Sequence, residues 1–197
     1  MTAYVLAAVL IAAVVVLVVR SYILAPVTEP RWTSDGAVAL VDEFSDDDAA
    51  EVEATLRRVR HRLRKFCRLA CKRWPHQACL HRLHQRWDGT LSEMRGAVAR
   101  THGKRRIFVC VRAPDGSIAS DDAIFYALLH EAAHCAEPAY NGHDASFWRT
   151  FRLLLECAEA LGLYTYAESP GTVCGLPLGK SVMRCVKDRS CDSQVFT

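Results

Sequence analysis

The residues best suited to chemistry are His130 and His134, with Glu131 directly after the first of them. Side chains four residues apart lie on the same face of a helix, one turn above the other, so these two imidazoles could grip one metal ion. Glu131 could then reach a water molecule on that ion. This is the HExxH arrangement of zinc hydrolases. The spacing therefore predicts one catalytic Zn²⁺.

A catalytic zinc takes three protein ligands and keeps one position open for water. His143, nine residues after His134, is the expected third ligand. The alternative is Glu156, an acid on the following helix, which is where gluzincins carry their third ligand. Tyr140 lies on the intervening loop and could donate a hydrogen bond to a tetrahedral intermediate, or it could pack the loop instead.

The flanking residues predict the elements that must position these groups. Ser120 is a suitable N-cap for a helix that carries residues 130–134, and Asp121 and Asp122 suit its first turn. The apolar approach to His130 indicates a half-buried helix. A second helix is expected from Asp144 to Leu161, with Gly162 at its end. Residues 106–112 are β-branched and aromatic, which is typical of a buried strand.

These motifs resemble a known family. The matching runs are 107–112, 115–116, 127–134, 142–148, 151–156, 161–164 and 173–175. They look like the WLM/SprT-like zinc metallopeptidases, most of all the versions in large double-stranded DNA viruses. The resemblance implies an α+β, zincin-like fold over residues 45–185, with His130, His134 and His143 as metal ligands and Glu131 as general base. It also implies that a strand along the cleft pairs with extended substrate. The gap between His134 and His143 departs from the shorter gap common in that family.

The N-terminal segment is apolar. Residues 2–19 carry no charge, and as a helix they would span about 27 Å, close to the thickness of a bilayer core. They predict a transmembrane anchor (residues 1–20), with a cleaved signal peptide as the alternative. Arg20 and Arg31 then favour a cytosolic domain, in which most cysteines would be reduced, whereas a domain that faces a lumen would favour disulfides. A linker is expected over 21–44 and a disordered tail over 186–197.

A long helix is predicted from Ser45 to Trp74, ended by Pro75. Most of this helix belongs to a basic stretch of the chain: residues 54–87 hold eleven Lys and Arg and no acid. The basic stretch, from residue 57 to residue 86, has two interpretations. It could bind nucleic acid or anionic lipid headgroups, or it could be a solvated helix face. A second zinc site is a further possibility in this region, although its spacing fits no standard finger. The residues concerned are Cys67, Cys71, His76, Cys79, His81 and His84.

The function expected from these observations is a membrane-anchored zinc metallopeptidase that cleaves protein or peptide substrates by a metal-activated water. The alternative is a non-catalytic zinc module that binds nucleic acid or anionic membrane through its basic helix. Glu131 argues against the alternative, because a purely structural zinc site does not need it.

Overall fold

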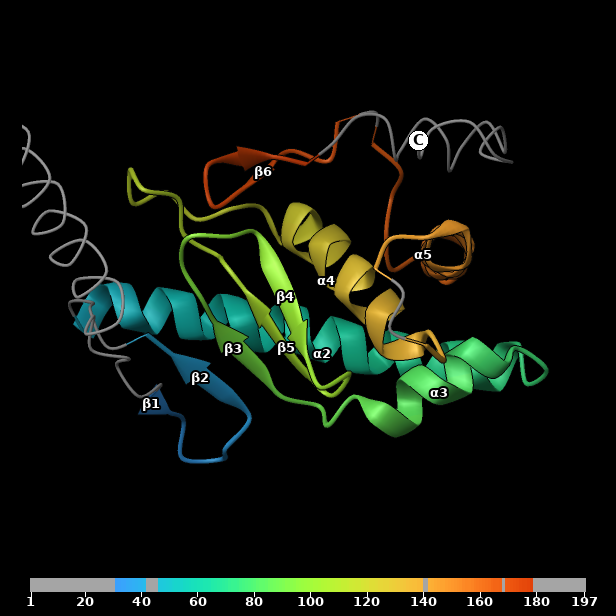
Figure 1. Ribbon diagram of the computed structural model, residues 1–197. Helices are drawn as coiled ribbons and strands as arrows, with labels where there is room; N and C mark the ends of the chain where they lie inside the picture. The colour runs from blue at the N-terminus through green and yellow to red at the C-terminus, as the bar shows by residue number, and fades with distance from the viewer. Residues whose placement is uncertain (1–30, 42–45, 140–141, 168, 179–197) are drawn as a thin grey trace, which may run out of the picture.

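The computed structural model describes residues 31–41, 46–139, 142–167 and 169–178, which form an α+β fold (Figure 1). The strands and helices in these residues are β1 (Arg31–Trp32), β2 (Val38–Leu40), α2 (Asp46–Arg73), α3 (Ala78–Arg86), β3 (Leu91–Glu93), β4 (Ala99–His102), β5 (Arg106–Val109), α4 (Asp121–Ala136), α5 (Ala145–Ala160), β6 (Thr172–Val173) and β7 (Leu176–Pro177).

The main sheet has the strand order β1-β2-β3-β5-β4. β3 pairs in parallel with both β2 and β5, whereas β1 and β4 pair antiparallel with their neighbours. In the register of β4 and β5, Thr101 lies opposite Ile107 and Arg100 lies opposite Phe108. Ile107 and Val109 are buried while Arg100 and His102 are exposed. One face of this sheet therefore packs into the core, and the other face meets solvent.

Helices α2 and α4 pack against the sheet, and α4 is also in contact with α3 and α5 (Figure 1). The buried stripe of α2 recurs every three or four residues, as an amphipathic helix requires. It consists of Val52, Leu56, Val59, Leu63, Phe66 and Ala70. α4 is apolar on nearly all sides, which fits its central position in the core.

Helices α2, α4 and α5 follow their predicted starts and stops, whereas α3 was not predicted. Ser120 caps α4, since its hydroxyl accepts a hydrogen bond from the Ala123 N–H at 3.2 Å. Asp144 caps α5 through the Phe147 N–H at 2.9 Å. α2 occupies the predicted long helix and ends at Arg73, two residues before Pro75. The local cap signals of the sequence are thus confirmed.

The strands depart further from expectation. Residues 31–40, expected within a linker, form β1 and β2 of the main sheet. No strand was predicted at β3 or at β4. These strands have two to four residues each, too few to display a period of two in the sequence. The expected strand over 106–112 is β5, which is shorter and ends at Val109.

The membrane predictions require correction. Among the described residues, no helix is long and apolar enough to cross a bilayer. α2 has the length, but Lys and Arg recur along its second half. The predicted transmembrane helix, and the single-pass membrane localisation that depended on it, are not supported and are withdrawn. Residues 2–19, to which both were assigned, lie outside the described residues, as does the tail at 186–197.

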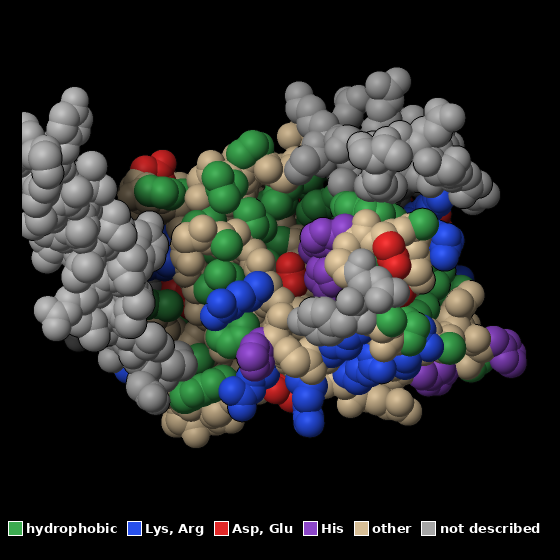
Figure 2. Space-filling model, in the orientation of Figure 1, with side chains coloured by type: hydrophobic (Ala, Val, Ile, Leu, Met, Phe, Trp, Pro, Cys, Tyr) green, Lys and Arg blue, Asp and Glu red, His purple; other side chains and the backbone are tan. Residues whose placement is uncertain are grey.

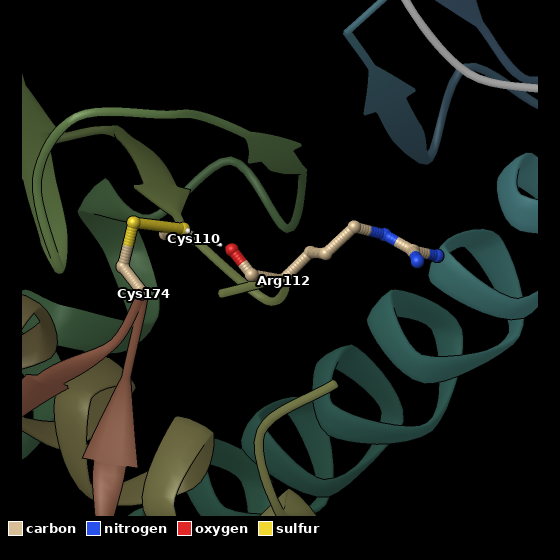
Figure 3. The surroundings of a disulfide bond; sticks show 3 residues. All are labelled: Cys110, Arg112 and Cys174. Carbon is tan, nitrogen blue, oxygen red and sulfur yellow. Dashed lines mark hydrogen bonds between the residues drawn. A yellow bond between two sulfur atoms is a disulfide. The ribbon is translucent and has the colours of Figure 1, made fainter. Parts of the chain in front are cut away.

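A disulfide joins Cys110, just after β5, to Cys174 in the β6–β7 hairpin (Figure 3). Cys110 Sγ also lies 3.2 Å from the carbonyl oxygen of Arg112. The five free cysteines among the described residues are Cys67, Cys71, Cys79, Cys135 and Cys157. The bond between Cys110 and Cys174 ties the hairpin to the end of the sheet, so at least these two cysteines are not reduced in this structure.

Candidate metal centre and cleft

The first two histidines of the motif project from one face of α4. His130 and His134 are one helical turn apart, and their ring centres are separated by 5.2 Å. Both side chains are partly buried, because Phe147 of α5 packs against them at 4.9 and 4.3 Å between ring centres. Packing on an aromatic side chain restricts the imidazole rotamers, so the two rings are held in place.

His143 reaches the same point from the loop before α5. Its Nε2 lies 3.0 Å from Nε2 of His130 and 3.1 Å from Nε2 of His134. The loop is fixed by Trp148, whose indole N–H donates to the His143 carbonyl at 2.8 Å. Gly142 has a φ of 65°, a left-handed conformation that favours glycine, and this turn directs the chain back to α4.

The three imidazoles fit a metal ion. Their ligand atoms all lie within 4.8 Å of one another, and they form the one such group in the described part of the chain. Two nitrogens on a tetrahedral zinc, each about 2.05 Å from it, are about 3.3 Å apart, near the observed spacing. Burial lowers the pKa of His130 to about 3 and that of His134 to about 4, aided by the neighbouring histidines. Neutral rings keep a lone pair for a metal.

Glu131 lies beside this cluster and is buried, with 6% of its surface exposed. Its carboxylate accepts a hydrogen bond from the Thr101 hydroxyl at 2.8 Å, and the same hydroxyl lies 3.0 Å from the Glu131 carbonyl. Burial raises the pKa of Glu131 to about 7, while the Thr101 hydroxyl opposes the rise. The carboxyl group thus lies where it could exchange a proton with a water molecule in the cleft.

These groups line a cleft of about 310 Å³ between β4 and the α4–α5 side of the molecule. Figure 2 shows His side chains (purple) and Lys and Arg side chains (blue) on one face of the molecule. Ala99, Arg100 and Thr101 of β4 form one wall. The strand along the cleft is therefore β4, at the edge of the sheet. The strand at residues 106–112, which was expected to lie there, is β5 and is enclosed between β3 and β4.

Basic side chains stabilise the C-terminal end of α4, close to the histidines. Arg82 donates to the Ala136 carbonyl at 2.6 Å, and Arg86 donates to the Cys135 and Glu137 carbonyls. Lys104 also donates to the Glu137 carbonyl, at 2.6 Å. The last carbonyls of a helix have no partner within it and carry partial negative charge, so these cations satisfy and stabilise them.

The other predicted site residues lie elsewhere. Glu156 is exposed on α5 and does not belong to the group of ligand atoms. Tyr140 lies outside the described residues. The cysteines and histidines between residues 67 and 84 form no second group of three ligands among the described residues. Cys67 and Cys79 are buried, and burial raises the pKa of both thiols.

Two residues of this site carried no predicted role. Thr101 is thirty residues from Glu131, and Trp148 was noted only as part of a resemblance, so local spacing gave no sign of either contact. Comparisons of the chain with models of protein families, with curated proteins and with solved structures find no match. The resemblance to WLM/SprT-like metallopeptidases therefore depends only on the residues quoted for it.

Proposed function

We propose that this protein is a zinc-dependent metallopeptidase that hydrolyses peptide bonds. The observation that supports it most is the convergence of the Nε2 atoms of His130, His134 and His143 beside the buried carboxyl of Glu131. A structural zinc site is normally closed by four protein ligands. Three imidazoles with an adjacent acid in a cleft are instead the arrangement of a hydrolytic site.

In this proposal the three histidines hold the ion as neutral rings. A zinc ion bound there would lower the pKa of a coordinated water and polarise the substrate carbonyl. Glu131 accepts a proton from the attacking water and passes it to the leaving amine. Thr101 orients the Glu131 carboxylate, and Trp148 holds the loop that carries His143. Phe147 excludes water from one side of the imidazoles.

The edge strand β4 supports an extended peptide as the substrate. Cys110 donates its N–H to the Val98 carbonyl, and the bonds of an antiparallel pair alternate along the strand. The backbone groups of Ala99 and Thr101 therefore point toward the open edge, along the wall of the cleft. A substrate that adds as a further strand would run past the histidines with its backbone bonded to these two residues.

Metal content tests the proposal. We expect one zinc per chain in the full-length protein, its loss in His143→Ala and its retention in the control Glu156→Ala. Each substitution removes one potential ligand, so comparing the two variants distinguishes His143 from Glu156 as the third ligand. Absence of zinc from the wild type, or retention of full affinity in His143→Ala, would contradict the proposal. Retention in His143→Ala together with loss in Glu156→Ala would indicate the gluzincin ligand set.

A second candidate is a non-catalytic zinc module that binds nucleic acid or anionic lipid headgroups. The observation that favours it is a row of exposed side chains on one face of α2, spaced three or four residues apart. The row consists of His61, Arg64, Lys65, Arg68 and Lys72. Other members of the basic stretch are engaged inside the fold, for example Arg60 with the Gly89 carbonyl and Arg62 with the Leu163 carbonyl. Steeply salt-dependent DNA binding without peptide hydrolysis would favour this candidate.

A further inference from the structure

The segment that forms the β4 wall of the cleft is strongly basic. Between Glu93 and Asp115 the chain has no acid, and it has six Lys and Arg residues. Three of them are occupied within the fold, since Arg106 pairs with Asp88, Arg112 pairs with Asp48, and Lys104 binds the end of α4. Arg100 is different, because no carboxylate of the described residues pairs with it.

The position of Arg100 on β4 gives it a defined relation to an added strand. It lies between Ala99 and Thr101, whose backbone groups face the open edge. The residue of an added antiparallel strand opposite Arg100 would therefore form a non-hydrogen-bonded pair with it, in which side chains approach most closely. Both side chains would stand on the exposed face of the sheet, away from Thr101 and Glu131.

The Arg100 side chain is held on that face by its other neighbour. Its guanidinium carbon lies 4.9 Å from the centre of the Phe108 ring, directly across on β5. A guanidinium above an aromatic ring is attracted to it and still has N–H donors that can bind a carboxylate. The acids that line the cleft lie on the α4–α5 side and have other partners, and Glu131 accepts a hydrogen bond from Thr101. Asp144 caps α5, and the Glu137 carboxylate accepts a hydrogen bond from Thr150.

We propose that Arg100 makes the enzyme selective for extended peptides with Asp or Glu at the position opposite it. The substrates would then be acidic segments of proteins, cut where an acid occupies this one position. A carboxylate there gains an oppositely charged neighbour, whereas Lys or Arg meets a like charge directly across the strand. The inference rests on the proposed peptidase function and specifies its substrate class.

A positional set of quenched fluorescent peptides tests this selectivity. Each peptide carries Glu, Gln or Lys at one position of a neutral, extended sequence, and kcat/KM is measured with the zinc-loaded full-length protein. We expect one position at which Glu exceeds Lys by about tenfold. The ratio of kcat/KM for the Glu peptide to that for the Lys peptide should fall to about one in Arg100→Gln and below one in Arg100→Glu. The control is Arg105→Glu, which reverses the charge of an exposed turn residue next to β4 and should keep the preference.

Binding provides a readout that does not require hydrolysis. Zinc-loaded Glu131→Gln protein should bind the fluorescein-labelled Glu peptide about tenfold more tightly than the Lys peptide, and Arg100→Glu in that background should reverse the order. Hydrolysis without any positional preference, or a preference that survives Arg100→Glu, would overturn this inference and leave the peptidase function standing. If the protein holds no zinc and neither cuts nor binds any peptide, the proposed function fails and this inference fails with it.

Discussion

At the scale of single residues, Glu131 is the side chain on which the proposed chemistry depends most. It is buried beside three histidines, and the Thr101 hydroxyl at 2.8 Å is the hydrogen-bond donor that orients its carboxylate. A buried acid with one donor costs folding free energy, and groups of this kind are found most often at functional sites. Its burial is therefore consistent with a functional carboxyl group.

The substitution Glu131→Gln should separate chemistry from metal binding. The amide has the same shape and can still accept the Thr101 hydrogen bond, but it cannot take a proton. We expect kcat/KM for peptide hydrolysis to fall by about 100-fold or more, while zinc content stays at one per chain. Zinc analysis alongside a fluorogenic peptide assay measures both. Hydrolysis at the wild-type rate would exclude Glu131 as the general base.

The sequence could predict residues whose partners are near in the chain. His130 and His134 follow from helical periodicity, and the capping roles of Ser120 and Asp144 follow from residue type. Thr101 and Trp148 act across loops or between a strand and a helix, and periodicity carries no information on such contacts. β4 was not predicted for another reason. It has only four residues, too few for the alternation of its side chains to be recognised in the sequence.

At the scale of secondary-structure elements, the basic stretch has a use that was not predicted. Four of its arginines donate hydrogen bonds to backbone carbonyls: Arg60, Arg62, Arg82 and Arg86. Two of these bind the C-terminal end of α4, which carries the metal site. Composition alone cannot distinguish arginines that donate to backbone carbonyls within the fold from arginines on a surface that binds nucleic acid. Both kinds occur on the polar face of an amphipathic helix.

The substitution Arg86→Met tests the importance of this end of α4. It keeps the aliphatic part of the side chain but leaves the Cys135 carbonyl without its side-chain donor and the Glu137 carbonyl with Lys104 alone. We expect the free energy of unfolding to fall by about 1 to 3 kcal/mol, as measured by urea denaturation. Arg64→Met is the control, because Arg64 is exposed on α2, and it should change stability by less than about 0.5 kcal/mol. Equal effects of the two would contradict a capping role for Arg86.

Strand β3 provides a prediction on pH. Glu93 is only 4% exposed, and its carboxylate accepts the Val41 N–H at 3.2 Å. Burial raises its pKa, so the folded state binds this proton more tightly than the unfolded state. Protonation of Glu93 therefore stabilises the folded state. This stabilisation is complete below the pKa that the carboxyl has in the unfolded chain, about 4.3, and is lost as pH rises through the higher pKa that it has in the folded state.

Glu93→Gln should remove this pH dependence, since the amide oxygen can still accept the Val41 N–H. We expect the variant to gain stability relative to wild type between pH 4 and pH 7, as measured by urea midpoints across that range. Glu156→Gln removes a carboxylate from an exposed position and serves as the control. A relative gain that is larger at pH 4 than at pH 7 would show that the sign is wrong.

At the scale of the whole molecule, the fold brings three distant segments to one cleft: β4, the end of α4 and the start of α5. Helices α2, α4 and α5 could be predicted in order because cap residues or apolar periodicity mark them in the sequence, whereas α3, which has no side-chain cap, was not predicted. The sheet could not, because its parallel pairs join β2 to β3 and β3 to β5 across long stretches of chain. The cleft depends on β4 lying at the edge, which is a property of the sheet order alone.

The disulfide is the other long-range feature that the sequence did not predict. With nine cysteines in the chain, spacing gave no basis for pairing Cys110 with Cys174 across 64 residues. The bond fastens the β6–β7 hairpin, whose Val173 is buried against the core and which contacts α4. Closing a loop of this length removes conformational entropy from the unfolded chain.

Reduction of this bond should therefore destabilise the whole domain. We expect a strong reductant to lower the free energy of unfolding of the wild type by about 2 to 4 kcal/mol in urea denaturation. The double variant Cys110→Ala/Cys174→Ala should start near that lower value and should not respond to the reductant. It is the matched control, because the five other described cysteines are already free and remain in place. A wild type whose stability is the same with and without reductant would contradict the stabilising role of the disulfide, whereas a response that persists in the double variant would assign the effect to other cysteines.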